Sequence, residues 1–474
     1  HRIYIRGILY IMAKALNEVY PEALLSVNYQ LSSAMFCKID NMEITDEMIA
    51  NVKARMQEII NQNLEIRKVV MTKEEAEEFY SNEKTLRGIV QIDNTQKEGV
   101  SLYYCEDYFN YFFGVMPVTT AYTDVFDVIK YGDGFLVRYP SAEKPNELTN
   151  YKSNKKLLST LEEYEDIHRV LQIDTLYKLN KEIKEGRTSN VILLSEALHE
   201  KKMANIADDI AKRKNVKMVL IAGPSSSGKT TFAKRLGVEL RLNGLKPVTI
   251  SVDNYFVERV DNPKDENGDY DFECLEAIDL ELFNNHIKTL LDGGTIDVPT
   301  FDFKVGTKRY NGEKMHLADD EILVIEGIHC LNDKLTSSIP REQKYKIYIS
   351  DLTVLNIDYC NRISTTDTRL IRRIVRDNNF RGYSALHTLR TWASVNRGEN
   401  KNIFPYQENC DVMFNSSLIY ELSVLKKQAL PLLQEITNAE PEYAEAKRLV
   451  EFLKYFEEVD EGLIPQNSLL REFV

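Results

Sequence analysis

The stretch Gly223-Pro-Ser-Ser-Ser-Gly228-Lys229-Thr230 decides the fold of this chain. It follows a short apolar run, residues 216–222, and precedes a helical pattern that continues to residue 242. Glycines allow the backbone to approach a ligand closely, and successive N–H groups at a helix N-terminus bind phosphate groups. The alternative is a serine-rich turn before an ordinary helix. The strand–loop–helix order favours a loop that binds a nucleoside triphosphate.

Two side chains of this loop have predicted roles in binding ATP and Mg²⁺. The ammonium group of Lys229 is expected to reach the β- and γ-phosphates, and the Thr230 hydroxyl to ligate the Mg²⁺ ion. The loop reads phosphates and not the purine, so it does not separate ATP from GTP. We assign ATP binding to Gly223, Pro224, Ser225, Ser226, Ser227, Gly228, Lys229, Thr230 and Thr231.

Composition limits the class of protein. The 474 residues are 43% hydrophobic and 28% charged, as in globular proteins with two or three domains. Interrupted apolar runs predict neither a membrane span nor a signal peptide. Six scattered cysteines without a CxxC pair argue against a zinc ribbon or a disulfide framework and indicate a reducing cytoplasm. A net charge of −13 disfavours broad binding of nucleic acid.

The predicted elements divide the chain into four parts. Residues 1–150 resemble an α+β domain, 151–213 a linker with helices, 214–440 a P-loop domain, and 441–474 a helix with a tail. In the third part strands alternate with helices, which predicts a doubly wound parallel sheet of the α/β class. Its candidate strands are 216–222, 248–252, 322–325, 346–350 and 412–414.

Two carboxylates follow predicted strands of this sheet. Asp253 comes after the second strand, and Glu326 closes the third. Carboxyl ends of parallel strands meet at the ligand crevice, so both acids are expected near the γ-phosphate. Asp253 could accept a proton from an attacking hydroxyl, and Glu326 could support the Mg²⁺ ion. For each acid alone, a solvated carboxylate at a strand end is the alternative.

Basic and acidic clusters lie between and after these strands. Arg369, Arg373 and Arg376 share one face of a predicted helix, which we interpret as a mobile lid over the transferred phosphate or, alternatively, as a solvated basic helix. Asp302 and the acidic stretch 269–276 could bind sugar hydroxyls or form a solvated loop.

Together these motifs resemble the uridine kinase/phosphoribulokinase family. The resemblance covers about residues 215–435 and rests on five motifs in the family's order: the loop 223–231, 251–255, 298–303, 325–327 and 367–377. It implies ATP-dependent phosphorylation of a hydroxyl, most simply the 5′-OH of a nucleoside. It also implies that Asp253 is the catalytic base, that Glu326 is the acid on the metal side, and that Arg373, Arg376 and Arg381 are arginines of the lid. Lys229 of the phosphate loop completes the residues expected to act in catalysis.

Some positions depart from that family. Gly306 stands where uridine kinases have a histidine that reads the pyrimidine, and Phe301 replaces a tyrosine. Tyr383 and Thr391 replace an arginine and a glutamine that help to hold the nucleoside. The acceptor could therefore be another small alcohol, such as a sugar phosphate. The residues expected to contact it are Asp253, Tyr255, Glu276, Phe301, Asp302 and Tyr383.

A second resemblance lies at the N-terminus. Residues 9–21 and the helix 45–61 look like the editing domain of threonyl-tRNA synthetase, in which a His-x₃-His pair would align with Tyr10 and Lys14. A metal site is therefore expected to be lost. Residues 1–150 carry 15 basic and 22 acidic side chains, which does not suit a tRNA-binding surface. Bacterial proteins with both modules often carry a further small domain, so the full protein is expected to extend upstream of His1.

The sequence thus predicts a cytoplasmic bacterial nucleoside kinase whose partner is a small-molecule acceptor. It predicts no membrane span and no nucleic-acid partner, and a homo-oligomer is possible. The competing function from another class is an ATP-binding regulatory or RNA-associated protein.

Overall fold

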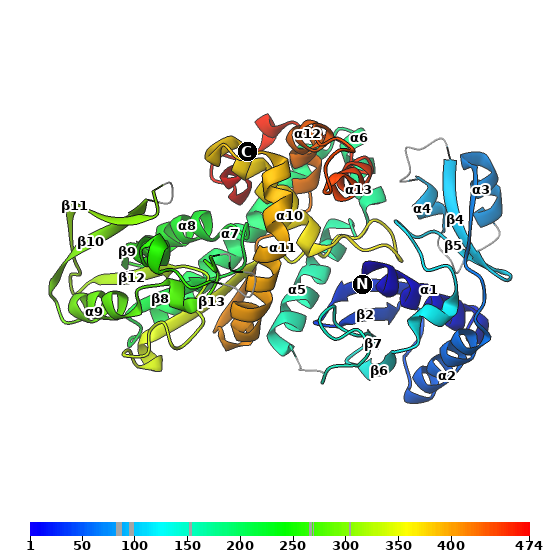
Figure 1. Cartoon of the computed structure of the whole chain (residues 1–474), viewed down its shortest axis with the longest axis horizontal. Helices are drawn as coiled ribbons and strands as arrows, with labels where there is room; N and C mark the ends of the chain where they lie inside the picture. The colour runs from blue at the N-terminus through cyan, green and yellow to red at the C-terminus, as the bar shows by residue number, and fades with distance from the viewer. Residues whose placement is uncertain (82–87, 94–98, 151–153, 265–267, 269, 303–304) are drawn as a thin grey trace. The chain divides into compact units, whose positions relative to one another are not determined.

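The computed structural model describes residues 1–81, 88–93, 99–150, 154–264, 268, 270–302 and 305–474 (Figure 1). The chain forms two compact units, and each unit consists of three chain segments. Unit 1 contains His1–Arg187, Thr353–Ser364 and Arg448–Glu457; unit 2 contains Thr188–Leu352, Thr365–Lys447 and Glu458–Val474. These bounds differ from the four contiguous parts expected, because two later segments return to unit 1.

Unit 2 is built on a five-stranded parallel sheet, as the alternation of strands and helices predicts. The strand order is β14-β13-β8-β12-β9, and every neighbouring pair is parallel. The strands are β8 (Met218–Ala222), β9 (Lys246–Ser251), β12 (Glu321–Glu326), β13 (Lys344–Ser350) and β14 (Val412–Asn415). All five residues of β8 are buried, as expected of a central strand covered on both faces.

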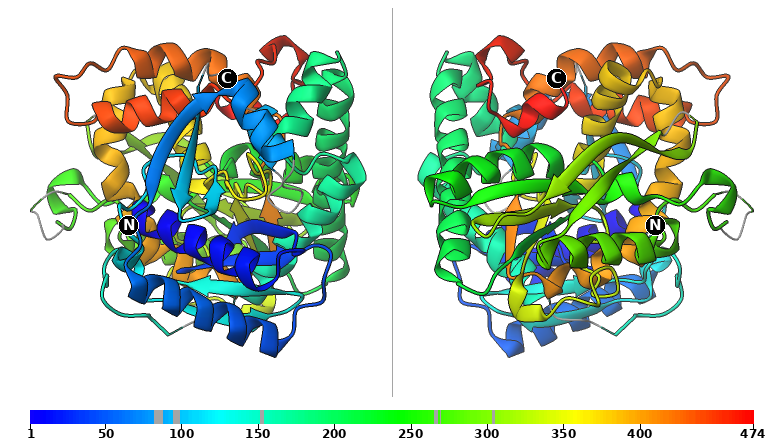
Figure 2. Two further views of the ribbon diagram at one scale, coloured as in Figure 1. Left: turned by 90° about the vertical axis from the view of Figure 1, so that its right-hand side faces the viewer. Right: turned by 90° about the vertical axis from the view of Figure 1, so that its left-hand side faces the viewer.

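Helices complete unit 2. The core on one face of the sheet joins α7 (Thr188–Lys212) and α8 (Lys229–Leu242) to apolar residues of the strands, among them Val219 and Val324. The remaining helices are α9 (Leu280–Leu291), α10 (Thr365–Arg376), α11 (Ala385–Asn402) and α12 (Glu421–Gln434). The sequence did not predict the hairpin of β10 (Thr295–Asp302) and β11 (Thr307–His316), which forms a long twisted ribbon in the right-hand view of Figure 2.

Unit 1 has a four-stranded antiparallel sheet of order β1-β2-β7-β6. The strands are β1 (Leu25–Gln30), β2 (Ala34–Ile39), β6 (Asp127–Tyr131) and β7 (Gly134–Arg138). Helices α1 (Arg2–Val19) and α2 (Asp46–Gln62) share its apolar core. The side chain of Thr45 accepts a hydrogen bond from the Met48 N–H and caps α2, which corresponds to the helix expected over 45–61.

A second, three-stranded sheet belongs to the same unit. Its strands, in the order β3-β4-β5, are β3 (Arg67–Thr72), β4 (Gly99–Cys105) and β5 (Tyr108–Asn110). Four helices accompany it in the chain: α3 (Lys73–Ser81), α4 (Gly88–Asp93), α5 (Lys155–Leu171) and α6 (Leu176–Lys184). Gln172 ends α5 in a left-handed conformation with φ of 58°, within the stretch that was expected to hold a linker with helices.

The segment Thr353–Ser364 is tied into unit 1 by polar and apolar contacts. The Asn356 side chain donates to the Val27 carbonyl (3.0 Å), and the Phe113 N–H donates to the Asn361 side chain (2.7 Å). Cys360 belongs to the apolar core of the unit. Helix α13 (Tyr443–Leu453) contains a unit boundary, since Lys447 ends the second segment of unit 2 and Arg448 begins the third segment of unit 1.

Two further observations concern the whole described chain. All six cysteines are buried free thiols. Among the described residues, no helix has the length and apolar character needed to span a bilayer.

Candidate active site

The carboxyl ends of β8, β9 and β12 open into a cleft of about 1140 Å³ within unit 2. In the register of the sheet, Glu326 at the end of β12 lies beside Ser251 of β9 and Ile221 of β8. The loop after β8 therefore lies next to the residues that follow β9 and β12. The lining includes Ser225, Ser226, Ser227, Gly228, Lys229, Thr230, Asp253, Glu326, Arg373, Arg376 and Arg381.

The loop itself requires its glycines. A Cβ atom on Gly223 would lie 1.9 Å from the Ile349 carbonyl oxygen, so only glycine fits beside β13. Gly228 has φ of +84°, which favours glycine, and α8 begins at the next residue. The Lys229 ammonium group donates to the carbonyls of Gly223 (2.9 Å) and Pro224 (3.1 Å) and so lies over the loop.

The two strand-end carboxylates lie in the cleft. Asp253 belongs to the short 3₁₀ turn Val252–Tyr255 and lines the cleft with an exposed side chain. Desolvation by the surrounding cleft walls raises its pKa, while Lys229 and Arg381 oppose this shift. Burial also raises the pKa of Glu326, and Asp253 adds to the shift. The Ser251 hydroxyl donates to the Glu326 carboxylate (2.9 Å). Because the Asp253 carboxylate disfavours ionisation of Glu326, a cation bound near both would stabilise their charged forms.

The same edge offers hard oxygen ligands. Thr230, Asp253 and Glu326 line one cleft and bring a hydroxyl and two carboxylates. In the described part of the chain, no group of three or more His, Cys, Asp or Glu side chains could hold a metal ion. The Thr230 hydroxyl and the carboxylates of Asp253 and Glu326 fit Mg²⁺. This ion takes one or two carboxylates from a protein and completes its coordination shell with water and phosphate oxygens.

The predicted arginine helix presents two different faces. Arg373 and Arg376 line the cleft, and both pair with the buried carboxylate of Asp377, at 3.2 and 2.8 Å. Arg381 also lines the cleft, and its Nε atom lies 3.7 Å from Asp377. Arg369 differs from the expectation, because it is 2% exposed and does not line the cleft. The short π-helical turn Asp377–Arg381 connects the cleft face of α10 to Gly382.

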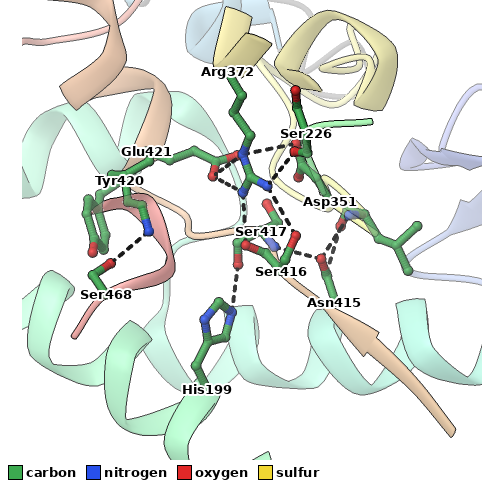
Figure 3. Close-up of polar contacts among 12 residues, drawn as sticks. His199, Ser226, Asp351, Arg372, Asn415, Ser416, Ser417, Tyr420, Glu421 and Ser468 are labelled. Atoms are coloured by element: carbon green, nitrogen blue, oxygen red, sulfur yellow. Dashed lines mark hydrogen bonds and ion pairs between the residues drawn. The ribbon is translucent and has the colours of Figure 1, made fainter. Parts of the chain in front are cut away.

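The buried face of α10 holds the phosphate loop. The Arg372 guanidinium donates to the carbonyls of Ser226 (3.3 Å) and Ser416 (2.9 Å) and pairs with Glu421 (Figure 3). Burial raises the pKa of Glu421, and Asp351 adds to this shift while Arg372 opposes it. The arrangement joins the loop, α10 and the end of β14.

The Ser416–Ser417 turn forms further hydrogen bonds, with His199 and with Asn415. His199 of α7 donates to the Ser417 carbonyl (3.1 Å), as Figure 3 shows. The Asn415 side chain accepts from the N–H groups of Leu352 (2.8 Å) and Ser417 (2.9 Å). The Ser416 carbonyl, to which Arg372 donates, therefore belongs to a turn that is also held by His199 of α7 and by Asn415 at the end of β14.

The residues expected to contact the acceptor separate into two groups. Phe301 and Tyr383 line the cleft. Tyr255 is buried, and its hydroxyl forms a 3.1 Å hydrogen bond with His286 Nδ1. Asp302 pairs with Arg309 at 3.1 Å, and neither it nor Glu276 is among the residues that line the cleft.

Other cleft residues were not singled out from the sequence. Glu273 lines the cleft, and burial and the nearby Glu399 raise its pKa to about 7, while Arg373 and Lys229 oppose the shift. Glu273 lies in the acidic stretch 269–276 that was expected to bind sugar hydroxyls, but Glu276 was the residue of this stretch expected to contact the acceptor. Glu472 also lines the cleft, and its carboxylate accepts the Thr231 N–H (3.2 Å); no motif marked it.

An aromatic wall and a basic side chain complete the cleft. Phe256, Tyr270, Phe272 and Phe301 line it, and their neighbouring ring centroids are 5.5–6.3 Å apart. Arg259 packs on Gly306, where an added Cβ atom would lie 2.6 Å from Arg259 Nε. Gly306 therefore makes room for a cationic side chain.

Comparison with known proteins gives one family. The model of the phosphoribulokinase/uridine kinase family matches residues 218–421. The uridine kinase of Bacillus subtilis (strain 168) is 27% identical over 222 residues, 46% of this chain and 96% of its own. That of Ligilactobacillus salivarius (strain UCC118) is 30% identical over 187 residues, 39% of this chain and 78% of its own. The structure of a possible uridine kinase from Bacillus stearothermophilus is 17% identical, covering 45% of this chain and 98% of its own, with a TM-score of 0.31.

Proposed function

Because the chain belongs to the phosphoribulokinase/uridine kinase family, we propose that it transfers the γ-phosphate of ATP to the 5′-hydroxyl of a nucleoside. The observation that carries this proposal is one cleft lined by the phosphate loop, by Asp253 and by Arg373 and Arg376. Phosphoryl transfer needs a positioned nucleophile and cations around the transferred group, and these side chains can supply both.

Each side chain has a role that follows from its chemistry. Asp253 accepts or orients the proton of the acceptor hydroxyl, which its raised pKa favours. Lys229, Arg373 and Arg376 neutralise charge on the phosphates. Thr230 and Glu326 would hold Mg²⁺, which supplies further positive charge when it is bound.

The aromatic wall supports a nucleoside as the acceptor. Tyr270 and Phe272 are each 39% exposed, which leaves ring surface for a base to stack on. Stacking on an aromatic ring tolerates every base. The cleft could therefore accept a nucleoside although Gly306 and Phe301 stand where the family has a histidine and a tyrosine.

The second candidate is a kinase of a phosphorylated small alcohol. Arg259 beside Gly306 favours it, because a guanidinium group recognises phosphate oxygens in a two-point contact. Lys264 also lines this part of the cleft.

For unit 1 we propose a scaffold or regulatory role and a threonyl-tRNA synthetase editing-like fold. Tyr10 donates to the Tyr103 carbonyl (3.0 Å), and the buried Lys14 donates to the Cys105 carbonyl (3.2 Å) and pairs with Glu18 (2.6 Å). A tyrosine and an ion-paired lysine supply no neutral nitrogen ligand for zinc, which supports the loss of a metal site. The free thiols support the cytoplasm as the proposed location.

The deciding experiment measures ADP release by the full chain with Mg·ATP against ribonucleosides, deoxyribonucleosides and sugar phosphates. Lys229→Ala provides the blank. Stimulation by a nucleoside supports the first candidate, and stimulation by sugar phosphates alone supports the second. If Mg·ATP binds but no acceptor stimulates turnover, the regulatory or RNA-associated function replaces both.

A further inference from the structure

Ser225 of the phosphate loop is held at all three of its polar groups by α10 and α11. Its N–H donates to Glu399 Oε1 (2.8 Å), and its carbonyl accepts from Arg369 Nη1 (3.2 Å). Its hydroxyl accepts from Arg373 Nη1 (3.0 Å). Because the Ser225 N–H donates to a carboxylate, the orientation of this peptide is fixed within a loop that lines the cleft.

The two residues that hold the Ser225 backbone form a buried ion pair. Arg369 Nη1 and Nη2 donate to Glu399 Oε1 (2.7 Å) and Oε2 (2.8 Å). This two-point contact fixes the guanidinium and carboxylate planes relative to each other. Arg369 is 2% exposed and Glu399 is fully buried. The Arg369 guanidinium lies 5.5 Å from the Trp392 ring centroid.

The next loop residue is held in the same way. Arg372 donates to the Ser226 carbonyl from one helical turn beyond Arg369. Two consecutive carbonyls of the loop therefore accept from two arginines on the buried face of α10. The cleft face of the same helix carries Arg373 and Arg376.

Stability alone does not explain a buried pair of this kind. Removing two charges from water costs as much as their attraction returns, and apolar replacements of equal volume are often as stable. A bidentate pair does, however, fix the atoms that it contacts. We propose that Arg369 and Glu399 are positioning residues for phosphoryl transfer, which hold the Ser225 peptide in the orientation that the triphosphate requires. This inference rests on the proposed kinase function.

The test replaces the pair by apolar residues in the full chain, as Arg369→Met with Glu399→Leu. We expect the thermal midpoint to stay within about 5 °C of the wild type, since no unpaired charge remains. Acrylamide quenching of Trp392, the one tryptophan of the sequence, reports whether the local packing persists. The dissociation constant for Mg·ATP, measured by calorimetry, is expected to rise at least about tenfold, and turnover to fall by about 10²-fold.

A matched control neutralises an exposed pair of the same unit, Lys246→Gln with Asp320→Asn, whose side chains are 65% and 57% exposed. This variant is expected to bind Mg·ATP like the wild type. If the apolar double variant keeps both its thermal midpoint and its affinity for Mg·ATP, the pair is structural only and the inference is wrong.

A second variant decides the question if the apolar double variant does not fold. Arg369→Lys keeps the charge but loses the planar two-point contact. Weaker Mg·ATP binding at a wild-type thermal midpoint supports the inference, and unchanged binding contradicts it. Because this readout needs no acceptor, a wild type that binds Mg·ATP and phosphorylates nothing contradicts the proposed function without affecting this test.

Discussion

Asp253 is the cleft carboxylate from which we expect the largest single effect on chemistry. Asp253→Asn keeps the shape and the hydrogen-bonding oxygen but cannot accept a proton. Turnover on the acceptor is expected to fall by about 10²–10⁴-fold, as for loss of a general base. The thermal midpoint should not fall, because the cleft around Asp253 already disfavours its charged form. Near-native turnover of this variant would show that another group orients the hydroxyl.

Glu273 predicts a dependence of stability on pH. Its pKa is raised to about 7 in the folded protein from an ordinary value of 4.5. Because the carboxyl group ionises at a lower pH in the unfolded chain than in the folded protein, the free energy of unfolding falls as pH rises from 4.5 to 7. The loss persists above pH 7. Glu273→Gln should therefore be more stable than the wild type at pH 8, by at most about 3 kcal/mol, with little difference at pH 4.5. Thermal unfolding at both pH values tests this, and an equal difference at both would refute it.

At the scale of elements, the contact between the phosphate loop and β13 predicts that Gly223 cannot be replaced. Gly223→Ala forces a Cβ atom against the Ile349 carbonyl, so Mg·ATP binding should be lost and the thermal midpoint should fall. Gly237→Ala in α8 is the control, because its Cβ atom would lie 3.4 Å from Pro247 and alanine favours a helix. Equal Mg·ATP affinity of both variants would contradict the close approach.

The N-terminal end of α8 gives another prediction at this scale. The Glu472 carboxylate accepts the Thr231 N–H, and phosphate groups bind at such helix ends. Glu472→Gln removes a negative charge there and should lower the dissociation constant for Mg·ATP by about 2- to 5-fold. The exposed Glu458→Gln is the control. Weaker binding by Glu472→Gln would mean that the carboxylate assists the nucleotide.

At the scale of the whole molecule, periodicity and strand-end acids predict much of unit 2. The five candidate strands all form, and Asp253, Glu326 and Arg373 line one cleft, because parallel strands bring their carboxyl ends together. Periodicity also placed Arg369 beside Arg373. It could not show that Arg369 is buried, since burial of that charge depends on Glu399, thirty residues later in the chain.

Unit boundaries escape sequence reasoning for a related physical reason. Residues 353–364 follow a strand of unit 2 without a linker composition, yet Cys360 lies in the core of unit 1. Contacts between distant segments leave no local signal in hydrophobic periodicity. The hydrogen bond between Tyr255 and His286 likewise joins distant residues and could not be predicted from the sequence.

The three-segment construction of unit 1 has a consequence for synthesis on the ribosome. Residues 1–187 emerge first, but Ile357, Cys360, Phe452 and Phe456, which are buried, come much later. At 5–20 residues per second, about 15–55 s separate the first segment from the last. During that interval the nascent chain carries an apolar core that lacks its last two segments, 353–364 and 448–457. A chaperone that shields this core would have to stay bound until nearly all of unit 2 has been translated.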